Sequence, residues 1–321
     1  MATSRSPSPG SALNIYTAVA QNKRRTTLLF GAFLLLVSFV AFAVGIIVGL
    51  PPAPAGIAAG AALVIGTLLA IWVYRSADGM VLGISEAHEV ERRDQPELFR
   101  TIENLCIGSG LPMPRVYVIE DSAPNAFATG RDPQHASVAI TTGLLQKLSK
   151  TELEGVMAHE LSHIGNFDTR LMVITAVLVG FIALMADAAL RLTWYGAGHR
   201  PRYKGKGESP AHAVLLVLAI VGAILAPLIA KTIQLAISRQ REYLADASGA
   251  LLTRYPEGLA SALEKLEGDK EPLEAANKAT AHLYIVNPLK GHKSAVNNLY
   301  ATHPPIQERV KRLRAMGTPG A

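Results

Sequence analysis

The residues best placed to do chemistry form a His-Glu-x-x-His pattern at His159, Glu160 and His163. Two histidines four residues apart lie on one face of a helix, about one turn from each other, so both imidazoles can reach one metal ion. Zinc suits them because it accepts nitrogen ligands and keeps an open position in catalytic sites. We therefore expect one zinc ion per chain, a water activated by that ion, and Glu160 as the base that takes its proton.

The surrounding sequence predicts a helix that carries this pattern. Ser149 followed three residues later by Glu152 is a capping-box pattern, which marks a helix start. No proline interrupts the chain from there to Arg170, so Asn166 and Asp168 are expected on the same helix. These two residues fit local capping as well as they fit a role in the site. A surface helix with two solvated histidines is the alternative interpretation.

A third protein ligand is expected, because zinc in a hydrolase usually has three protein ligands and a water. Glu242 and Asp246 are the best candidates, since they sit four residues apart on one predicted helix. Their spacing does not choose between them, and Arg239 and Arg241 could instead neutralise both on a solvated face. We assign Glu242 as the ligand and Asp246 as the acceptor that orients a ligand histidine.

Two basic residues near the carboxyl end are candidates for catalysis. His303 precedes two prolines, and Arg309 follows in a basic segment. A cation near the zinc could stabilise the oxyanion formed at the scissile carbonyl. Arg309 could instead orient Glu242 or Asp246. We predict that His303 and Arg309 belong to the catalytic site.

The composition indicates a membrane protein. Of the 321 residues, 50% are hydrophobic and 17% are charged, whereas about a quarter of residues are charged in soluble proteins. The formal net charge of +6 is expected to set the topology and to meet anionic lipid. We find no nucleic-acid-binding motif and expect no nucleic-acid partner. Cys106 is the single cysteine, which excludes an intrachain disulfide.

Four apolar segments are long enough to cross a bilayer as helices, which rise roughly 1.5 Å per residue. They are residues 28–50, 56–74, 171–192 and 213–237. A cleaved signal peptide is the alternative for the first, but that segment is long for a signal and a second follows directly. Lys23–Arg25 and Arg75 place both ends of the first hairpin in the cytoplasm. If the second hairpin spans the membrane, its basic loop lies outside and opposes this rule, so partial embedding or packing on the catalytic domain also stays open.

These features predict an α-helical membrane protein with four transmembrane helices and a mostly α, α+β zincin-like (gluzincin) peptidase domain. A polar segment at 1–27, expected to be disordered over 1–22, precedes a transmembrane hairpin at 28–75. A second hairpin at 171–237 divides the peptidase domain into residues 76–170 and 238–321. Within the first of these parts, the pattern predicts a helical region at 85–107, with a helix start at Pro96, and strands at 115–119, 122–130 and 136–141.

Several motifs together resemble the HtpX-type membrane zinc metallopeptidases, which are related to the CAAX prenyl protease family. The resemblance covers nearly the full length, including the N-terminal apolar hairpin. Its motifs are Ala123–Gly130, Val138–Leu145, His159–His163, Arg241–Asp246 and Thr302–Pro305. Together they are more specific than the His-Glu-x-x-His pattern alone.

The resemblance implies an endopeptidase of the inner membrane that removes damaged or misassembled membrane proteins, with its catalytic domain facing the cytoplasm. It implies zinc ligation by His159, His163 and Glu242, with Glu160 as the base. It also implies a sheet edge that pairs with substrate backbone, formed by Asn125, Ala126, Phe127 and Ala128. The expected partners are membrane-protein substrates, unfolded polypeptides and the lipid bilayer. A membrane protease complex and a homo-oligomer both stay open.

Two other functions stay open. One is the processing of specific prenylated or signal-bearing substrates, against which the short soluble insertions argue weakly. The other is a non-catalytic, zinc-stabilised membrane scaffold. Glu160 argues against that function, because a structural zinc site closes with four ligands and needs no base.

Overall fold

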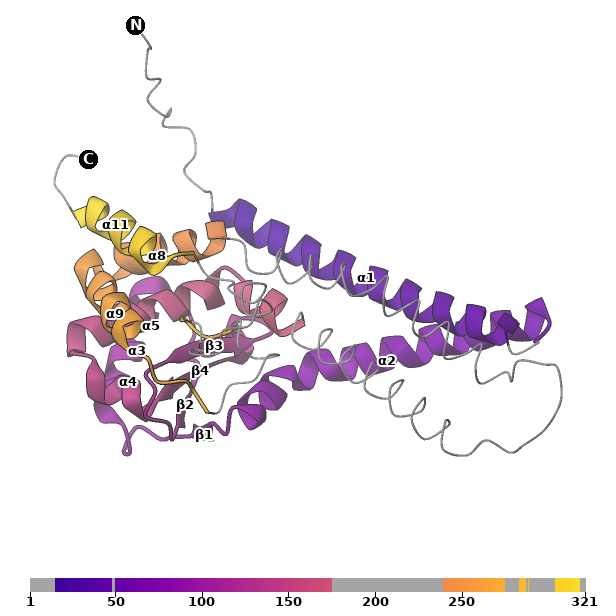
Figure 1. Ribbon diagram of the computed structural model, residues 1–321, viewed down its shortest axis with the longest axis horizontal. Coiled ribbons are helices and arrows are strands. Elements are labelled where there is room, and N and C mark those ends of the chain that lie inside the picture. Colours follow the sequence, from indigo (N-terminus) through magenta and orange to yellow (C-terminus); the bar gives the residue numbers. More distant parts are fainter. Residues whose placement is uncertain are drawn as a thin grey trace, which may run out of the picture.

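A pair of long helices and an α+β body make up the computed structural model (Figure 1). The structure describes residues 15–47, 50–174, 239–274, 283–286, 288 and 304–317. The helices α1 (Ile15–Ile47) and α2 (Pro52–Ile84) pack along each other. Pro52 is the first residue of α2, where its fixed φ suits a helix and its missing N–H would have no partner in any case. The two helices therefore form an antiparallel hairpin.

The helical hairpin agrees with the first two apolar segments but has different limits. Helix α1 begins at Ile15, so the expectation of disorder over residues 1–22 is wrong from that position onward. Helix α2 continues to Ile84, beyond the predicted boundary at residue 75. None of the helices in the described ranges combines the length and the apolar character needed to cross a membrane. The third and fourth apolar segments lie outside the described residues apart from 171–174, so the four-span arrangement stays a prediction.

The body contains a four-stranded sheet with the strand order β1-β2-β4-β3. Strand β2 (Arg115–Ile119) runs parallel to β4 (Ala136–Thr141), and both strands have the predicted limits. Strand β3 (Ala126–Gly130) runs antiparallel to β4, with Phe127 opposite Ala139. It begins four residues later than the predicted strand at 122–130. Strand β3 is therefore at one edge of the sheet, next to the metal-site helix.

The predicted helical region at 85–107 is wrong in its first half. Residues after α2 turn sharply, with Glu86 at a φ of +51°, and then form the short strand β1 (His88–Glu89). The pairing of His88 with Val118 on β2 outweighs the local helical pattern, because strand pairing depends on a partner distant in sequence. Helix α3 (Pro96–Ser109) begins at the predicted proline.

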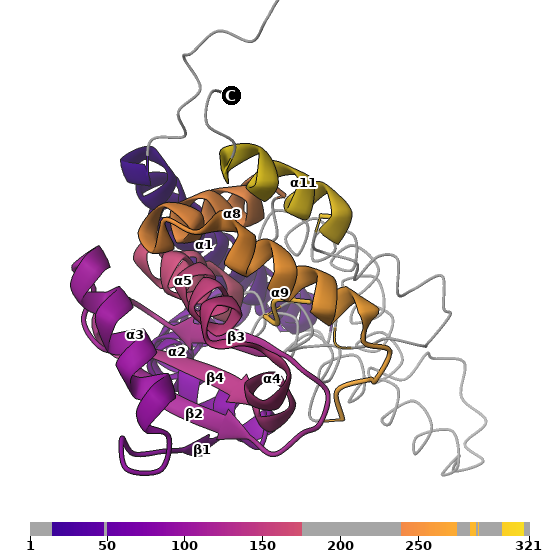
Figure 2. The same cartoon turned by 90° about the vertical axis from the view of Figure 1, so that its left-hand side faces the viewer.

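Helix α5 (Lys150–Gly165) is the centre of the body and carries the His-Glu-x-x-His pattern. It packs against β3, α3, α8 (Arg239–Thr253) and α9 (Pro256–Gly268). Figure 2 shows α5 between the sheet and α8, with α11 (Ile306–Gly317) beyond α8. A 3-10 turn (Pro133–His135) directly precedes β4, and the short α4 (Thr142–Lys147) directly follows that strand. The residues of α5 are mostly buried, including Val156, Met157 and Leu161.

Helices α5 and α8 approach each other closely beside His159. A Cβ atom on Gly249 of α8 would lie 3.0 Å from the backbone nitrogen of His159. The backbone of α5 cannot yield as a flexible side chain can, so glycine permits this approach. The approach brings the start of α8, with Glu242 and Asp246, within reach of the histidines.

Candidate metal centre

The start of α5 is fixed by the predicted capping box. The backbone N–H of Ser149 donates to Glu152 at 2.7 Å, and the Ser149 hydroxyl accepts in return from the third residue of the helix. Glu152 also accepts from Ser261 at 2.6 Å and from Lys265 at 2.7 Å, both on α9. Burial raises the pKa of Glu152, but these hydrogen bonds outweigh it and lower the pKa to about 2. The carboxylate therefore holds the metal-site helix against α9.

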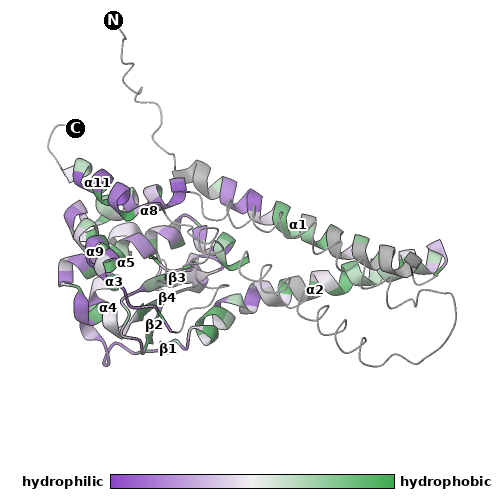
Figure 3. Ribbon diagram, viewed as in Figure 1, coloured by the Kyte–Doolittle hydropathy of each residue, from purple (hydrophilic) through white to green (hydrophobic). Residues whose placement is uncertain are grey.

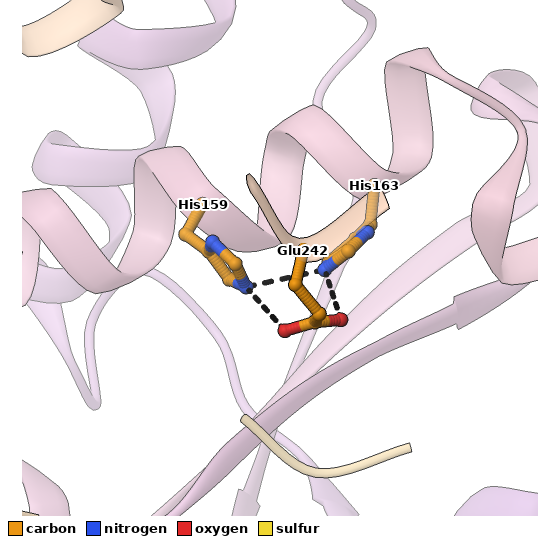
Figure 4. Close-up of side chains that lie close together, drawn as sticks. All are labelled: His159, His163 and Glu242. Carbon is orange, nitrogen blue, oxygen red and sulfur yellow. Dashed lines mark hydrogen bonds and ion pairs between the residues drawn. The ribbon is translucent and has the colours of Figure 1, made fainter. Parts of the chain in front are cut away.

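His159, His163 and Glu242 meet at one buried point (Figure 4). The Nε2 atoms of the two histidines are 3.1 Å apart. One oxygen of Glu242 lies 3.9 Å from Nε2 of His159, and the other lies 3.6 Å from Nε2 of His163. Within the described part of the chain, these side chains form a group whose potential ligand atoms all lie within 4.8 Å of one another. The structure thus brings together the three predicted ligands.

The donor set fits zinc. A tetrahedral zinc ion with nitrogen ligands at about 2.0–2.1 Å holds two of them about 3.3 Å apart, close to the 3.1 Å found here. Two imidazole lone pairs that face each other repel unless a cation or a proton lies between them. Two nitrogens and one carboxylate oxygen also match the ligand types of catalytic zinc sites.

A carboxylate stands behind each histidine. Nδ1 of His163 lies 3.0 Å from Asp168 in a hydrogen bond. Nδ1 of His159 lies 3.0 Å from Asp246, which is a hydrogen-bond length, although the N–H is not aligned for one in this conformation. Each carboxylate favours a proton on Nδ1 and leaves the Nε2 lone pair for the metal. Asp246 thus lies where the sequence prediction places the acceptor for a ligand histidine.

The expectation that Asn166 and Asp168 continue the metal-site helix is wrong. Helix α5 ends at Gly165, and Phe167 has a φ of +59° in the turn that follows. This turn redirects the chain and lets Asp168 reach back to His163, five residues earlier. In the sequence, the position of Asp168 fits local capping as well as a role in the site. The available signal was that each ligand histidine needs an acceptor at its second nitrogen.

Arg309 on α11 joins the carboxyl end of the chain to the metal centre. Its Nε and Nη2 atoms donate to the two oxygens of Asp246 at 2.9 and 2.7 Å. Its Nη1 atom lies 3.4 Å from Glu242 and donates to the carbonyl of Ile285 at 3.3 Å. Burial raises the pKa of Asp246, but Arg309 outweighs it and lowers that pKa to about 2. His303, the other predicted basic residue, lies outside the described residues.

Burial also shifts the titration of the histidines and of Glu160. It lowers the pKa of His159 to about 4, although Asp246 opposes the shift. Burial lowers the pKa of His163 as well, but Asp168 and Glu242 outweigh it and raise that pKa to about 9. Burial raises the pKa of Glu160 to about 7, against the opposing effect of His163. A carboxylate that titrates near neutral pH suits proton transfer at that pH.

The predicted substrate-binding residues Asn125–Ala128 lie beside the metal-site helix. The backbone N–H of Ala128 lies near Glu160 and lowers the pKa of that carboxyl, against the larger effect of burial. The carbonyl of Ala126 accepts from the N–H of Ile285 at 3.0 Å, and Asn125 donates to the carbonyl of Val286 at 3.1 Å. Phe127 points to the other face, where its ring contacts Tyr284 with centroids 5.0 Å apart. Residues 283–286 therefore already pair with the part of this edge near Asn125, and all of β3 is buried.

Comparisons with known proteins find a family model and curated relatives that match this chain. The model of peptidase family M48 matches residues 92–317. A protein named Protease HtpX homolog from Dictyoglomus turgidum is 45% identical over 311 residues, which cover 94% of this chain and 95% of that protein. The protein of the same name from Lactobacillus helveticus is 42% identical over 303 residues, which cover 94% and 100%.

The similarity to a solved structure is weaker than the similarity to these relatives. The crystal structure of S. mikatae Ste24p aligns with 78% of this chain and 57% of that chain, at 20% identity and a TM-score of 0.49. The family match covers most of the chain, and the relatives match almost all of it. The resemblance found in the sequence is confirmed: the chain belongs to peptidase family M48 and is a metallopeptidase.

Proposed function

We propose that this chain is a membrane-bound zinc endopeptidase that cleaves damaged or misfolded membrane proteins. The observation that carries the proposal is the convergence of His159, His163 and Glu242, with a carboxylate behind each histidine. A buried set of this kind costs free energy unless a cation joins it. One zinc ion per chain would be held by these three side chains.

The residues around the zinc site take separate roles in peptide hydrolysis. Zinc, when bound there, supplies a Lewis acid that makes water nucleophilic near neutral pH and polarises the scissile carbonyl. Glu160 takes the proton of the attacking water and later passes it to the leaving amine. Asp246 and Asp168 hold the histidines in the ligating tautomer. Arg309 is a positioning residue that acts through Asp246, and His303 is the candidate for stabilising the oxyanion.

The two long helices support a location in the inner membrane. Large apolar side chains along them are exposed, including Leu35 at 68% on α1 and Ile57 at 74% on α2. Figure 3 shows hydrophobic residues along the described parts of both helices. Such apolar surface suits lipid rather than water. With Lys23–Arg25 and Arg75 at the ends nearest the body, the catalytic domain would face the cytoplasm.

The substrates we propose are membrane proteins and unfolded polypeptides. A substrate backbone would add to β3 along Asn125–Ala128, through main-chain hydrogen bonds that give little sequence selectivity. Low selectivity suits the removal of many different damaged proteins. Because Ala126 already pairs with Ile285, the substrate would extend from Ala128 or replace residues 283–286 on this edge.

The decisive test compares Glu160→Gln with the matched control Glu154→Gln on the same helix. Each purified full-length protein is incubated with casein and with a model membrane protein, with and without a chelator, and its zinc content is measured. We expect Glu160→Gln to keep one zinc while cleavage falls by at least about two orders of magnitude. Glu154→Gln should cleave as the wild type does. Full activity of Glu160→Gln would contradict the proposed mechanism, and so would cleavage by the wild type that continues in the presence of the chelator.

A further inference from the structure

Asn22 on α1 lies directly behind the metal centre. The side chain is buried, with 3% of its surface exposed, although it stands in the polar segment before the first apolar run. Its amide nitrogen donates to Oδ1 of Asp168 at 2.7 Å and to the carbonyl of Asn166 at 3.0 Å. These contacts join residues more than 140 positions apart in sequence.

The contacts allow one orientation of the amide. Both partners of Asn22 are acceptors, a carboxylate oxygen and a backbone carbonyl, so only the NH₂ group can face them. Its two hydrogens are then both used. The other oxygen of Asp168 binds Nδ1 of His163 at 3.0 Å. An unbroken set of hydrogen bonds therefore runs from α1 through Asp168 to a metal ligand.

The neighbours of Asn22 on α1 also pack against the turn around Phe167, which follows α5. The ammonium of Lys23 lies 4.3 Å from the centroid of the Phe167 ring, within the range of a cation–π contact. Thr26, one helical turn further along α1, is 2% exposed. Phe167 is held at a φ of +59°, a conformation that a bulky residue keeps only where its surroundings enforce it. The docked helix therefore contributes to the turn that places Asp168.

We propose that Asn22 is a positioning residue of the metal centre, and that it makes zinc affinity depend on the docking of α1. By donating to Oδ1, Asn22 fixes the plane of the Asp168 carboxylate, so that Oδ2 faces His163. Asp168 then keeps His163 in the tautomer that binds metal. Helix α1 is thus a structural part of the zinc site as well as one of the two helices proposed to lie in the membrane. The inference rests on the zinc site of the proposed function.

The test measures zinc affinity in the full-length protein in detergent by competition with a chromophoric chelator. The variants are Asn22→Ala, Asn22→Ser, Asp168→Ala and the double variant Asn22→Ala/Asp168→Ala. Gln21→Ala is the matched control, because it removes an exposed amide from the adjacent position of α1. The visible spectrum of each cobalt-substituted protein reports the geometry of the ligands independently of activity.

Asn22→Ala should raise the zinc Kd about tenfold, the lower end of the range for partners of metal ligands, and should shift the cobalt spectrum. Asn22→Ser keeps one donor and should give a smaller change, which tests the inference even if the alanine variant does not fold. Gln21→Ala should match the wild type. In the Asp168→Ala background, Asn22→Ala should have no further effect on Kd, because its route to His163 is already removed.

Three outcomes would overturn the inference. Wild-type affinity and spectrum in both Asn22 variants would show that Asn22 does not position the site. An equal loss of affinity with and without Asp168 would indicate a general effect on folding. Absence of stoichiometric zinc in the wild type would overturn the proposed function together with this inference, whereas the first two outcomes leave that function intact.

Discussion

The guanidinium of Arg309 forms two hydrogen bonds with the carboxylate of Asp246, at 2.9 and 2.7 Å, and both side chains are buried. The pair joins α11 to α8 directly behind His159, whose Nδ1 atom lies 3.0 Å from the same carboxylate. Removal of one partner from a buried ion pair leaves an uncompensated charge, which costs more than the pair itself contributes. The carboxyl-terminal helix is therefore part of the support of the metal site.

Replacement of Arg309 by methionine should destabilise the protein by about 3–5 kcal/mol, because Asp246 then keeps a buried charge without its cation. Arg309→Lys keeps the charge but loses the planar fork that holds both carboxylate oxygens, so we expect a smaller loss. Thermal unfolding of the metal-free and zinc-loaded proteins measures both effects. The exposed Arg312, which pairs with Glu308 and lies 3.8 Å from the centroid of the Tyr243 ring, provides the control Arg312→Met, expected to cost no more than about 1 kcal/mol. Equal midpoints for Arg309→Met and Arg312→Met would contradict this prediction.

Removal of the Glu242 side chain should affect zinc binding more than removal of the Asp246 side chain. Of these two carboxylates, only Glu242 lies near the Nε2 atoms of both histidines. A direct ligand bonds to the metal and contributes to its affinity itself. Removal of the acceptor behind a ligand lowers metal affinity or activity by about 10–100-fold. We expect Glu242→Ala to lose stoichiometric zinc and Asp246→Ala to keep part of it while losing activity.

Metal analysis of the two purified variants after dialysis decides between the carboxylates. Zinc retained in full by Glu242→Ala and lost by Asp246→Ala would reverse the assignment. Zinc retained by both variants would place the third ligand elsewhere, with His303 as the next residue to examine.

Glu152 should stabilise the fold in a pH-dependent manner. Its pKa is lowered to about 2 in the folded protein, so its contribution is complete above the ordinary pKa of about 4.3 and is lost as the pH falls from there towards 2. Glu152→Gln should lower the free energy of unfolding by about 1–3 kcal/mol at neutral pH, since it weakens hydrogen bonds to a buried charge.

The pH profile of unfolding distinguishes this effect from a simple packing defect. The difference between wild type and Glu152→Gln should be constant from pH 7 to about 5 and should shrink below about pH 4.3. Both proteins are measured with a chelator, so that metal release at low pH does not contribute. Glu267→Gln, a change at an exposed carboxylate on α9, should leave stability unchanged. A difference that persists at pH 3 would show that the charge of Glu152 is not its source.

Local signals explain what the sequence predicts correctly. The capping box at Ser149 and Glu152 predicts the start of α5, and Pro96 predicts the start of α3. The β-branched content of residues 115–119 and 136–141 predicts β2 and β4 at their limits. Helical spacing likewise puts Glu242 and Asp246 on one face, and the family resemblance favours Glu242 as the ligand. The capping, proline, strand and helical-spacing signals each depend on residues within a few positions of one another, whereas the resemblance rests on motifs along nearly the whole chain.

Long-range contacts determine what local patterns miss. Strand β1 exists because His88 and Glu89 pair with β2, and two residues alone carry no strand signal. The turn at Phe167, which ends α5 early, lies where Lys23 of α1 packs on the ring. Nothing near Asn22 in the sequence indicates that it binds Asp168, which lies 146 positions away. These contacts are set by the tertiary packing rather than by propensity.

The edge of β3 that faces away from β4 predicts that the protein hydrogen-bonds every second residue of a bound substrate. Ala126 and Ala128 direct their backbone groups away from β4, since the carbonyl of Ala126 accepts from Ile285 and the N–H of Ala128 lies near Glu160. A peptide that adds to this edge would hydrogen-bond through every second residue. N-methylation of a peptide nitrogen removes one donor, and a single hydrogen bond contributes about 0.5–1.5 kcal/mol.

The measurement is a scan of singly N-methylated versions of one peptide whose cleavage site has been mapped by mass spectrometry. Methyl groups on the residues that face β3 should raise KM by roughly 2–10-fold, the range that corresponds to the loss of one hydrogen bond. Methyl groups on the intervening residues are the matched controls and should change KM little, except next to the scissile bond, where kcat also falls. Zinc content is unchanged throughout, because the protein is not altered. An effect of equal size at every position would show that the substrate does not bind as an added strand.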